Sequence, residues 1–151
     1  MGAENEALWQ LDEEGGIEKA YCCFASNARD FARFGKLFLH EGNWNGQQLI
    51  DSAYLKMMVT PRFPQSPQYG YGLWLNDYLG KKMYYMRGHL GQFCIVIPED
   101  NIIIVRLGHI KGLQTDEDPH SNDFYVYVDE AYKMMGMLKP GQGVGDSKQL
   151  K

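Results

Sequence analysis

The stretch from Met83 to His109, MYYMRGHLGQFCIVIPEDNIIIVRLGH, constrains the fold of this chain more than any other segment. It contains three apolar runs rich in β-branched and aromatic residues, which are typical of strands. The connections between these runs are very short. Short connections join antiparallel neighbours, because a parallel crossover needs about a dozen residues or more. The stretch therefore predicts an antiparallel meander.

We expect four strands in this sheet, near residues 70–76, 82–87, 93–98 and 102–108. Ile97-Pro98-Glu99-Asp100 suits a type I turn before the last strand, because proline presets φ at the second turn position. The aromatic residues around the first two strands are expected to pack across strands and not against a ligand. They are Tyr69, Tyr71, Trp74, Tyr84 and Tyr85.

Helical patterns lie on both sides of the predicted sheet. A first helix is expected after Ser26, a residue type that favours the N-cap position. A shorter helix is expected after Asp51 or Ser52. A last helix is expected over residues 123–138, and its apolar stripe should cover one face of the sheet.

The order helix, helix, antiparallel meander, helix places the chain in the α+β class. Residues 1–138 show no internal repeat and are expected to form a single segment, followed by a disordered tail over 139–151. The chain has 151 residues, 44% of them hydrophobic, which is enough apolar material for one buried core.

Composition argues against several kinds of partner. The formal charge is −4, and the basic residues are scattered, so we expect no nucleic-acid binding. There is no run of about 18 apolar residues, so no membrane-spanning helix is expected. The acidic, polar start lacks the pattern of a secretory signal and leaves the compartment open.

Cysteine and histidine spacing argues against disulfides and metals. Cys22, Cys23 and Cys94 are expected to be buried free thiols, because adjacent cysteines do not pair easily and no CxxC spacing occurs. The four histidines also lack metal-ligand spacing. They are His40, His89, His109 and His120.

The connection MRGHLGQ between two predicted strands is the strongest candidate for a functional site. Gly88 and Gly91 remove Cβ atoms and can bring backbone N–H groups close to a ligand. Arg87 adds a permanent cation, and His89 adds a titratable group. Donors of this kind suit an oxyanion or a carboxylate. The alternative is a β-bulge whose charged side chains face solvent, and the residues alone leave both interpretations open.

Residues 25–61, ASNARDFARFGKLFLHEGNWNGQQLIDSAYLKMMVTP, followed by YGYGLWL and GQFCIVIPEDNIIIVRLGH, resemble the serine β-lactamase and penicillin-binding-protein-like superfamily, class C branch. The RGxxGQ…P…VVRLG form is similar to the esterase and 6-aminohexanoate-dimer hydrolase group. The likeness spans residues 9–137. It implies the C-terminal portion of a β-lactamase/transpeptidase-like fold, with an antiparallel β-sheet packed by helices.

Such enzymes use a Ser-x-x-Lys motif for the acylated nucleophile, a Tyr-x-Asn motif for a general base, and a Lys-Thr-Gly-like strand. No serine of this chain begins Ser-x-x-Lys, and none of its ten tyrosines is followed two places on by Asn. The resemblance therefore implies the C-terminal segment of a serine hydrolase that acts on amide or ester bonds through an acyl-enzyme and is inactive alone. The alternative is a non-catalytic binding or interaction module of the same fold.

Two alignments of the third motif remain open. In one, Met86-Arg87-Gly88 takes its place, and the backbone N–H of His89 donates to the oxyanion. In the other, His89-Leu90-Gly91 takes its place, and Gln92 is the donor, although Leu90 lacks the usual hydroxyl. The first alignment puts Met86 where the family has Lys, which favours an ester or amide substrate over a β-lactam.

The resemblance also implies a substrate site and neighbours. Leu90 and Gly91 are expected to line the site for a small amide or ester, with no cofactor and no metal. In the family, further strands and a helical lobe cover this sheet. A separate C-terminal segment is therefore expected to expose an edge or a face and to self-associate. Most family members are exported, which does not fix the compartment of this chain.

Overall fold

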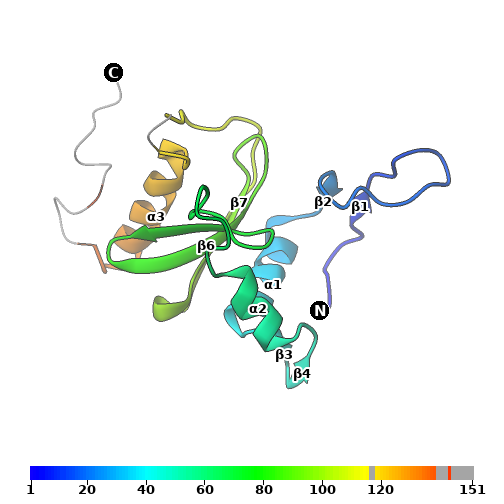
Figure 1. Cartoon of the computed structure of the whole chain (residues 1–151), viewed down its shortest axis with the longest axis horizontal. Helices are drawn as coiled ribbons and strands as arrows, with labels where there is room; N and C mark the ends of the chain where they lie inside the picture. The colour runs from blue at the N-terminus through cyan, green and yellow to red at the C-terminus, as the bar shows by residue number, and fades with distance from the viewer. Residues whose placement is uncertain (116–117, 139–142, 144–151) are drawn as a thin grey trace.

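A four-stranded antiparallel sheet, seen in the computed structural model, forms the centre of the molecule (Figure 1). The structure describes residues 1–115, 118–138 and 143. The strands follow one another in the order β5-β6-β7-β8. They are β5 (Trp74–Tyr78), β6 (Lys81–Arg87), β7 (Phe93–Ile97) and β8 (Ile102–Arg106). The predicted meander and the α+β class are confirmed.

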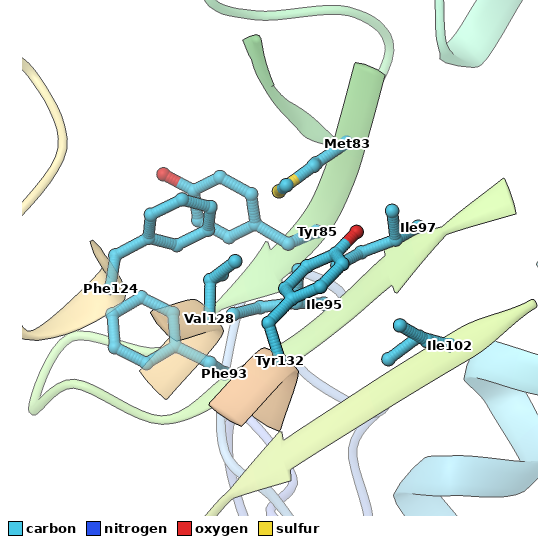
Figure 2. Packing of buried hydrophobic residues seen from close by; sticks show 9 residues of the cluster. All are labelled: Met83, Tyr85, Phe93, Ile95, Ile97, Ile102, Phe124, Val128 and Tyr132. Carbon is cyan, nitrogen blue, oxygen red and sulfur yellow. The ribbon is translucent and has the colours of Figure 1, made fainter. Parts of the chain in front are cut away.

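Alternating side chains give the sheet two buried faces. One face packs against α3 (Asn122–Met134), as the sequence predicted. Figure 2 shows this cluster, formed by Met83, Tyr85, Phe93, Ile95, Ile97, Ile102, Phe124, Val128 and Tyr132. The other face packs against α1 (Ala28–Leu39) and α2 (Ser52–Met58). Its buried cluster is Phe38, Leu55, Leu73, Tyr84 and Val96.

Two predicted strand ends were wrong because loop contacts end the strands earlier or start them later. β5 begins at Trp74 and not near residue 70, since the preceding turn is held to the end of α2, where Tyr71 N–H donates to Met58 C=O at 3.1 Å. β8 ends at Arg106 and not near residue 108. The chain turns after Arg106, and the Arg106 guanidinium donates to Ile110 C=O in the following loop at 2.7 Å.

Helix ends follow capping groups. The N-cap of α1 is Asn27 and not Ser26, because the Asn27 side chain accepts the Asp30 N–H at 3.0 Å. Asp51 caps α2, as one of the two predicted alternatives. The last helix ends at Met134 and not at residue 138, since Gly136 has φ +67° in the left-handed region that closes helices.

Short turns complete the chain. The predicted type I turn is a single 3₁₀ turn, η1 (Pro98–Asp100), followed by left-handed Asn101 with φ 57°. A hairpin of β3 (Asn43–Trp44) and β4 (Gln47–Gln48) was not predicted, although its Asn45-Gly46 connection is a standard hairpin signal. The disordered tail expected over residues 139–151 lies outside the described residues, apart from Gly143.

The expectation for the cysteines was partly wrong. Cys22 and Cys23 form a disulfide with each other beside the pair of β1 (Leu8–Trp9) and β2 (Phe24–Ala25). The backbone at Cys23 takes φ 71°, a left-handed conformation that accompanies this pairing and that the sequence did not indicate. Cys94 is a buried free thiol, as predicted, and burial raises its pKa to about 12.

None of the helices in the described part of the chain has the length and apolarity that crossing a membrane needs.

The expected self-association stays a prediction, and the outer strands and exposed apolar side chains define how it can be tested. β5 and β8 are the outer strands of the sheet, although the start of β5 is paired, since Leu75 N–H donates to Gln68 C=O at 2.8 Å. Ile110 and Leu113 in the loop after β8 are 80% and 81% exposed. Unpaired edges and apolar patches favour association. We expect light scattering to show species above the monomer mass that grow with concentration. The double variant Ile110→Ser/Leu113→Ser should reduce them without lowering Tm. A uniform monomer across micromolar concentrations would contradict this expectation.

Candidate active site

The loop Gly88–Gln92 between β6 and β7 is closed by hydrogen bonds of its own. Gly88 N–H donates to Gln92 C=O at 2.8 Å, and Gly91 N–H donates to Gly88 C=O at 3.2 Å. Leu90 N–H donates to the Gln92 side-chain oxygen at 3.1 Å. Three backbone donors of the loop are thus satisfied within the loop itself.

The two remaining backbone donors of this loop are unpaired. Within residues 1–115, 118–138 and 143, the N–H groups of His89 and Gln92 donate to no protein atom. These are the donors of the two alternative alignments. His89 and Leu90 are exposed, while Gly91 is buried. Backbone N–H groups require a hydrogen-bond partner. The N–H groups of His89 and Gln92 are therefore available to water or to a ligand.

Gly88 leaves room for a neighbouring side chain. A Cβ at this position would lie 2.2 Å from the Gln92 side-chain oxygen and 2.9 Å from the Gln92 Cβ. The Gln92 amide nitrogen also donates to Gly108 C=O in the loop after β8. Gly88 therefore leaves Gln92 in the position from which it joins two loops.

Arg87 is engaged by the loop that precedes α3. Its guanidinium donates to Pro119 C=O and to the Gln114 side-chain oxygen, both at 2.8 Å. The same group lies over the Trp74 ring, 4.5 Å from the ring centroid. The cation that the sequence suggested for a ligand thus holds this loop against β6.

His120, which sequence reasoning considered only as a metal ligand, is buried beside the same arginine. Its Nδ1 shares a short hydrogen bond with the Tyr85 hydroxyl, and its backbone N–H donates to Asp118 Oδ1 at 2.9 Å. Tyr125 donates to the other oxygen of Asp118 at 2.8 Å. No sequence pattern marks this cluster, because a long loop folds it against β6. No group of three metal-ligating side chains gathers anywhere in the described part of the chain.

Burial disfavours the charged forms of His120 and Tyr85. Burial lowers the pKa of His120, and the Arg87 charge lowers it further, against the opposing effect of Asp118. Burial also raises the pKa of Tyr85. The Tyr85 hydroxyl and the neutral His120 imidazole can therefore share one hydrogen bond at neutral pH.

The predicted aromatic packing is confirmed for Tyr69, Trp74 and Tyr85. Tyr84 is buried in the cluster on the other face, and Tyr71 is 42% exposed and contacts the Arg62 guanidinium instead of another strand. Trp74 lies opposite Tyr85 in the sheet register, with ring centroids 6.4 Å apart, and Tyr69 contacts the Trp74 ring edge-on at 5.3 Å. Cross-strand packing accounts for these rings without a ligand.

The sheet, the loop and its helices can be compared with known proteins. The family model described as β-lactamase matches residues 9–124, which is most of the chain. The chain belongs to the β-lactamase family. As a β-lactamase-like chain, it shares the fold of a family of hydrolases, with the antiparallel sheet and the helices described above.

Two proteins that this β-lactamase-like chain resembles are much longer. An uncharacterised protein of Alkalihalophilus pseudofirmus is 26% identical over 96 residues, which are 53% of this chain and 28% of that protein. A solved structure from Bacillus anthracis, named as a 6-aminohexanoate-dimer hydrolase, matches 88% of this chain and 35% of its own, with a TM-score of 0.65 and 23% identity. The chain thus spans 28% and 35% of the lengths of these two proteins.

Burial of His120 should make stability depend on pH. Its pKa in the folded state lies below the ordinary 6.5, so this contribution is complete above pH 6.5 and is lost as the pH falls toward the folded pKa. We expect the free energy of unfolding, measured by urea denaturation, to fall from about pH 7.5 to about pH 5. His120→Gln should flatten this dependence.

Two comparisons isolate the effect. The lowered pKa values of Asp30 and Asp100 act only below their ordinary 3.8, outside this window. His109→Gln, at an exposed position, should keep the wild-type dependence. An unchanged slope in His120→Gln would contradict the assignment.

Proposed function

We propose that this chain is the C-terminal segment of a serine hydrolase that cleaves small amides or esters through an acyl-enzyme. Residues 1–138 form that segment, and the loop Gly88–Gln92 supplies an oxyanion donor. One observation carries the proposal: the exposed loop leaves the N–H of His89 unpaired while three neighbouring N–H groups are bonded inside it. Membership of the β-lactamase family supports the reaction class.

The chemistry follows from what an acyl transfer needs. A serine oxygen attacks the carbonyl carbon and loses its proton to a base, and the carbonyl oxygen becomes an oxyanion. Collapse of this intermediate expels the amine or alcohol, which takes up the proton, and water then hydrolyses the acyl-enzyme. A donor N–H at 2.7–3.1 Å from the oxyanion lowers the barrier to acylation and the barrier to hydrolysis of the acyl-enzyme. The 151 residues lack Ser-x-x-Lys and Tyr-x-Asn, so we assign the nucleophile and the base to polypeptide outside them.

Substrate class is suggested by one substitution and one neighbour. Met86 stands where the first alignment expects Lys, which removes the cation that would bind the carboxylate of a β-lactam. The name of the Bacillus anthracis neighbour refers to an amide dimer of 6-aminohexanoate, and it supports an amide substrate. Arg87, engaged by Pro119 and Gln114, is proposed to shape this site and not to bind the substrate directly.

A second candidate is a non-catalytic binding or interaction module of the same fold. The absence of Ser-x-x-Lys and Tyr-x-Asn from these residues is compatible with both candidates. The coding sequence before residue 1 separates the two candidates. Ser-x-x-Lys and Tyr-x-Asn motifs there would support the enzyme, and an upstream sequence without them would support the module.

The chain alone should hydrolyse nothing. Oxyanion and binding groups without a nucleophile give only residual catalysis. We expect rates with p-nitrophenyl acetate and nitrocefin to equal those of a denatured control, and intact mass after fluorophosphonate treatment to show no adduct. Stoichiometric acylation of any of its serines would overturn the proposal that the nucleophile lies elsewhere.

Substitutions in the loop should separate the two alignments in a polypeptide that joins this chain to both missing motifs. His89→Ala keeps the backbone N–H, so kcat should change little if that group is the donor. Under the rival alignment the imidazole takes the cationic role of the motif, and the loss should be at least as large as for Gly88→Ala.

Gly88→Ala should lower kcat by about 10²-fold or more, the scale of losing one oxyanion donor. Because the new Cβ would collide with Gln92, the single variant Gln92→Ala, which removes the same side-chain contacts without a Cβ at position 88, controls for displacement of that side chain. A wild-type kcat in Gly88→Ala would remove this loop from the active site.

A further inference from the structure

We propose that Arg106 is a positioning residue that orients the unpaired N–H groups of the loop Gly88–Gln92. The hydrogen bonds of Arg106 position the loop whatever its function is. The importance of Arg106 for catalysis rests on the proposed function. Arg106 was not singled out by sequence reasoning and touches neither candidate donor directly.

The Arg106 guanidinium binds three backbone carbonyls from two loops. Nη1 donates to Gly91 C=O at 2.6 Å and to Leu90 C=O at 3.2 Å. Nη2 donates to Ile110 C=O at 2.7 Å. No carboxylate of the described residues forms an ion pair with Arg106. Its charge is therefore directed at backbone oxygens.

The surroundings of this guanidinium are shaped to admit it. A Cβ on Gly108 would lie 2.6 Å from the Arg106 Cζ, and a Cβ on Gly91 would lie 3.0 Å from Nη1. Gly91 also has φ +79°, a conformation that other residues rarely adopt. The Tyr127 ring of α3 lies 5.6 Å from the guanidinium carbon. Two glycines and one aromatic ring thus make a slot for a flat cation.

Because peptide groups are planar, the contacts of Arg106 with carbonyl oxygens also orient the N–H groups of His89 and Gln92. The C=O and N–H of one peptide point in opposite directions. Gly91 C=O faces Arg106, so the Gln92 N–H of the same peptide points away from it. Leu90 C=O also faces Arg106, which turns Gly91 N–H toward Gly88 C=O at 3.2 Å. Gly88 C=O shares its peptide with the His89 N–H, which consequently points outward. Arg106 therefore sets the direction of both candidate donors.

Lysine could not do the same. The guanidinium is planar and carries five donors in a fixed fork, whereas an ammonium is a compact charge on a flexible chain. A lysine at this position could keep one carbonyl contact but not hold Leu90, Gly91 and Ile110 together. Retention of charge is thus not sufficient for the orientation of the loop.

The first test uses the 151-residue chain and the ¹H–¹⁵N spectrum of its backbone. Arg106→Ala should shift the amide resonances of His89, Gly91 and Gln92, and Arg106→Lys should shift them in part. Millimolar guanidinium should restore the Arg106→Ala resonances, while equal NaCl should not. Arg62→Ala removes an arginine that stacks on Tyr71 elsewhere and should leave the loop unchanged. Leu55→Ala destabilises the opposite core cluster and controls for general loss of stability.

Unchanged loop amide resonances in Arg106→Ala would overturn the proposal, as would equal shifts in Leu55→Ala.

The second test measures kinetics in the polypeptide that carries both missing motifs. Arg106→Ala should lower kcat by about 10²-fold with a smaller change in KM, and guanidinium should restore kcat. If the amides shift but kcat does not change, the positioning holds and the proposed oxyanion function fails. A fall in kcat without shifted amides would overturn the positioning.

Discussion

The hydrogen bonds from Arg106 to the carbonyls of Leu90 and Gly91 are the constraint on which the candidate site depends. The hydrogen bonds within this five-residue connection close the loop, and the contacts from Arg106 add a restraint from outside it. Fixing two carbonyls fixes two peptide planes, and the N–H groups on those planes follow. The proposed oxyanion site therefore depends on backbone orientation and not on a reactive side chain within these residues.

The sheet register brings the supporting groups together. Phe93 on β7 lies opposite Arg87 on one neighbouring strand and Arg106 on the other. Each arginine stands at a strand end and donates to carbonyls of a following loop, Pro119 for Arg87 and Ile110 for Arg106. Phe93 packs below on Phe124 of α3. Both arginines therefore stand beside Phe93 in the sheet register, and each binds a carbonyl of the segment between β8 and α3.

The fold was largely predictable because it depends on local patterns. The apolar runs of β7 and β8 and the proline at position 98 define the meander by themselves. The N-cap of the first helix was not predictable, since Ser26 and Asn27 are both residue types that cap helices. The Cys22–Cys23 disulfide and the roles of Arg106 and His120 depend on backbone turns and on contacts between distant loops, which no local pattern encodes.

Replacing one backbone amide by an ester tests the central claim most directly. In a polypeptide that joins this chain to Ser-x-x-Lys and Tyr-x-Asn motifs, an α-hydroxy acid at position 89 removes the unpaired N–H and leaves the side chain in place. The account predicts that kcat falls by about 10²- to 10³-fold, while the same replacement at the exposed position 126 of α3 changes it little. An unchanged kcat with esters at both 89 and 92 would contradict the claim that this loop binds the oxyanion.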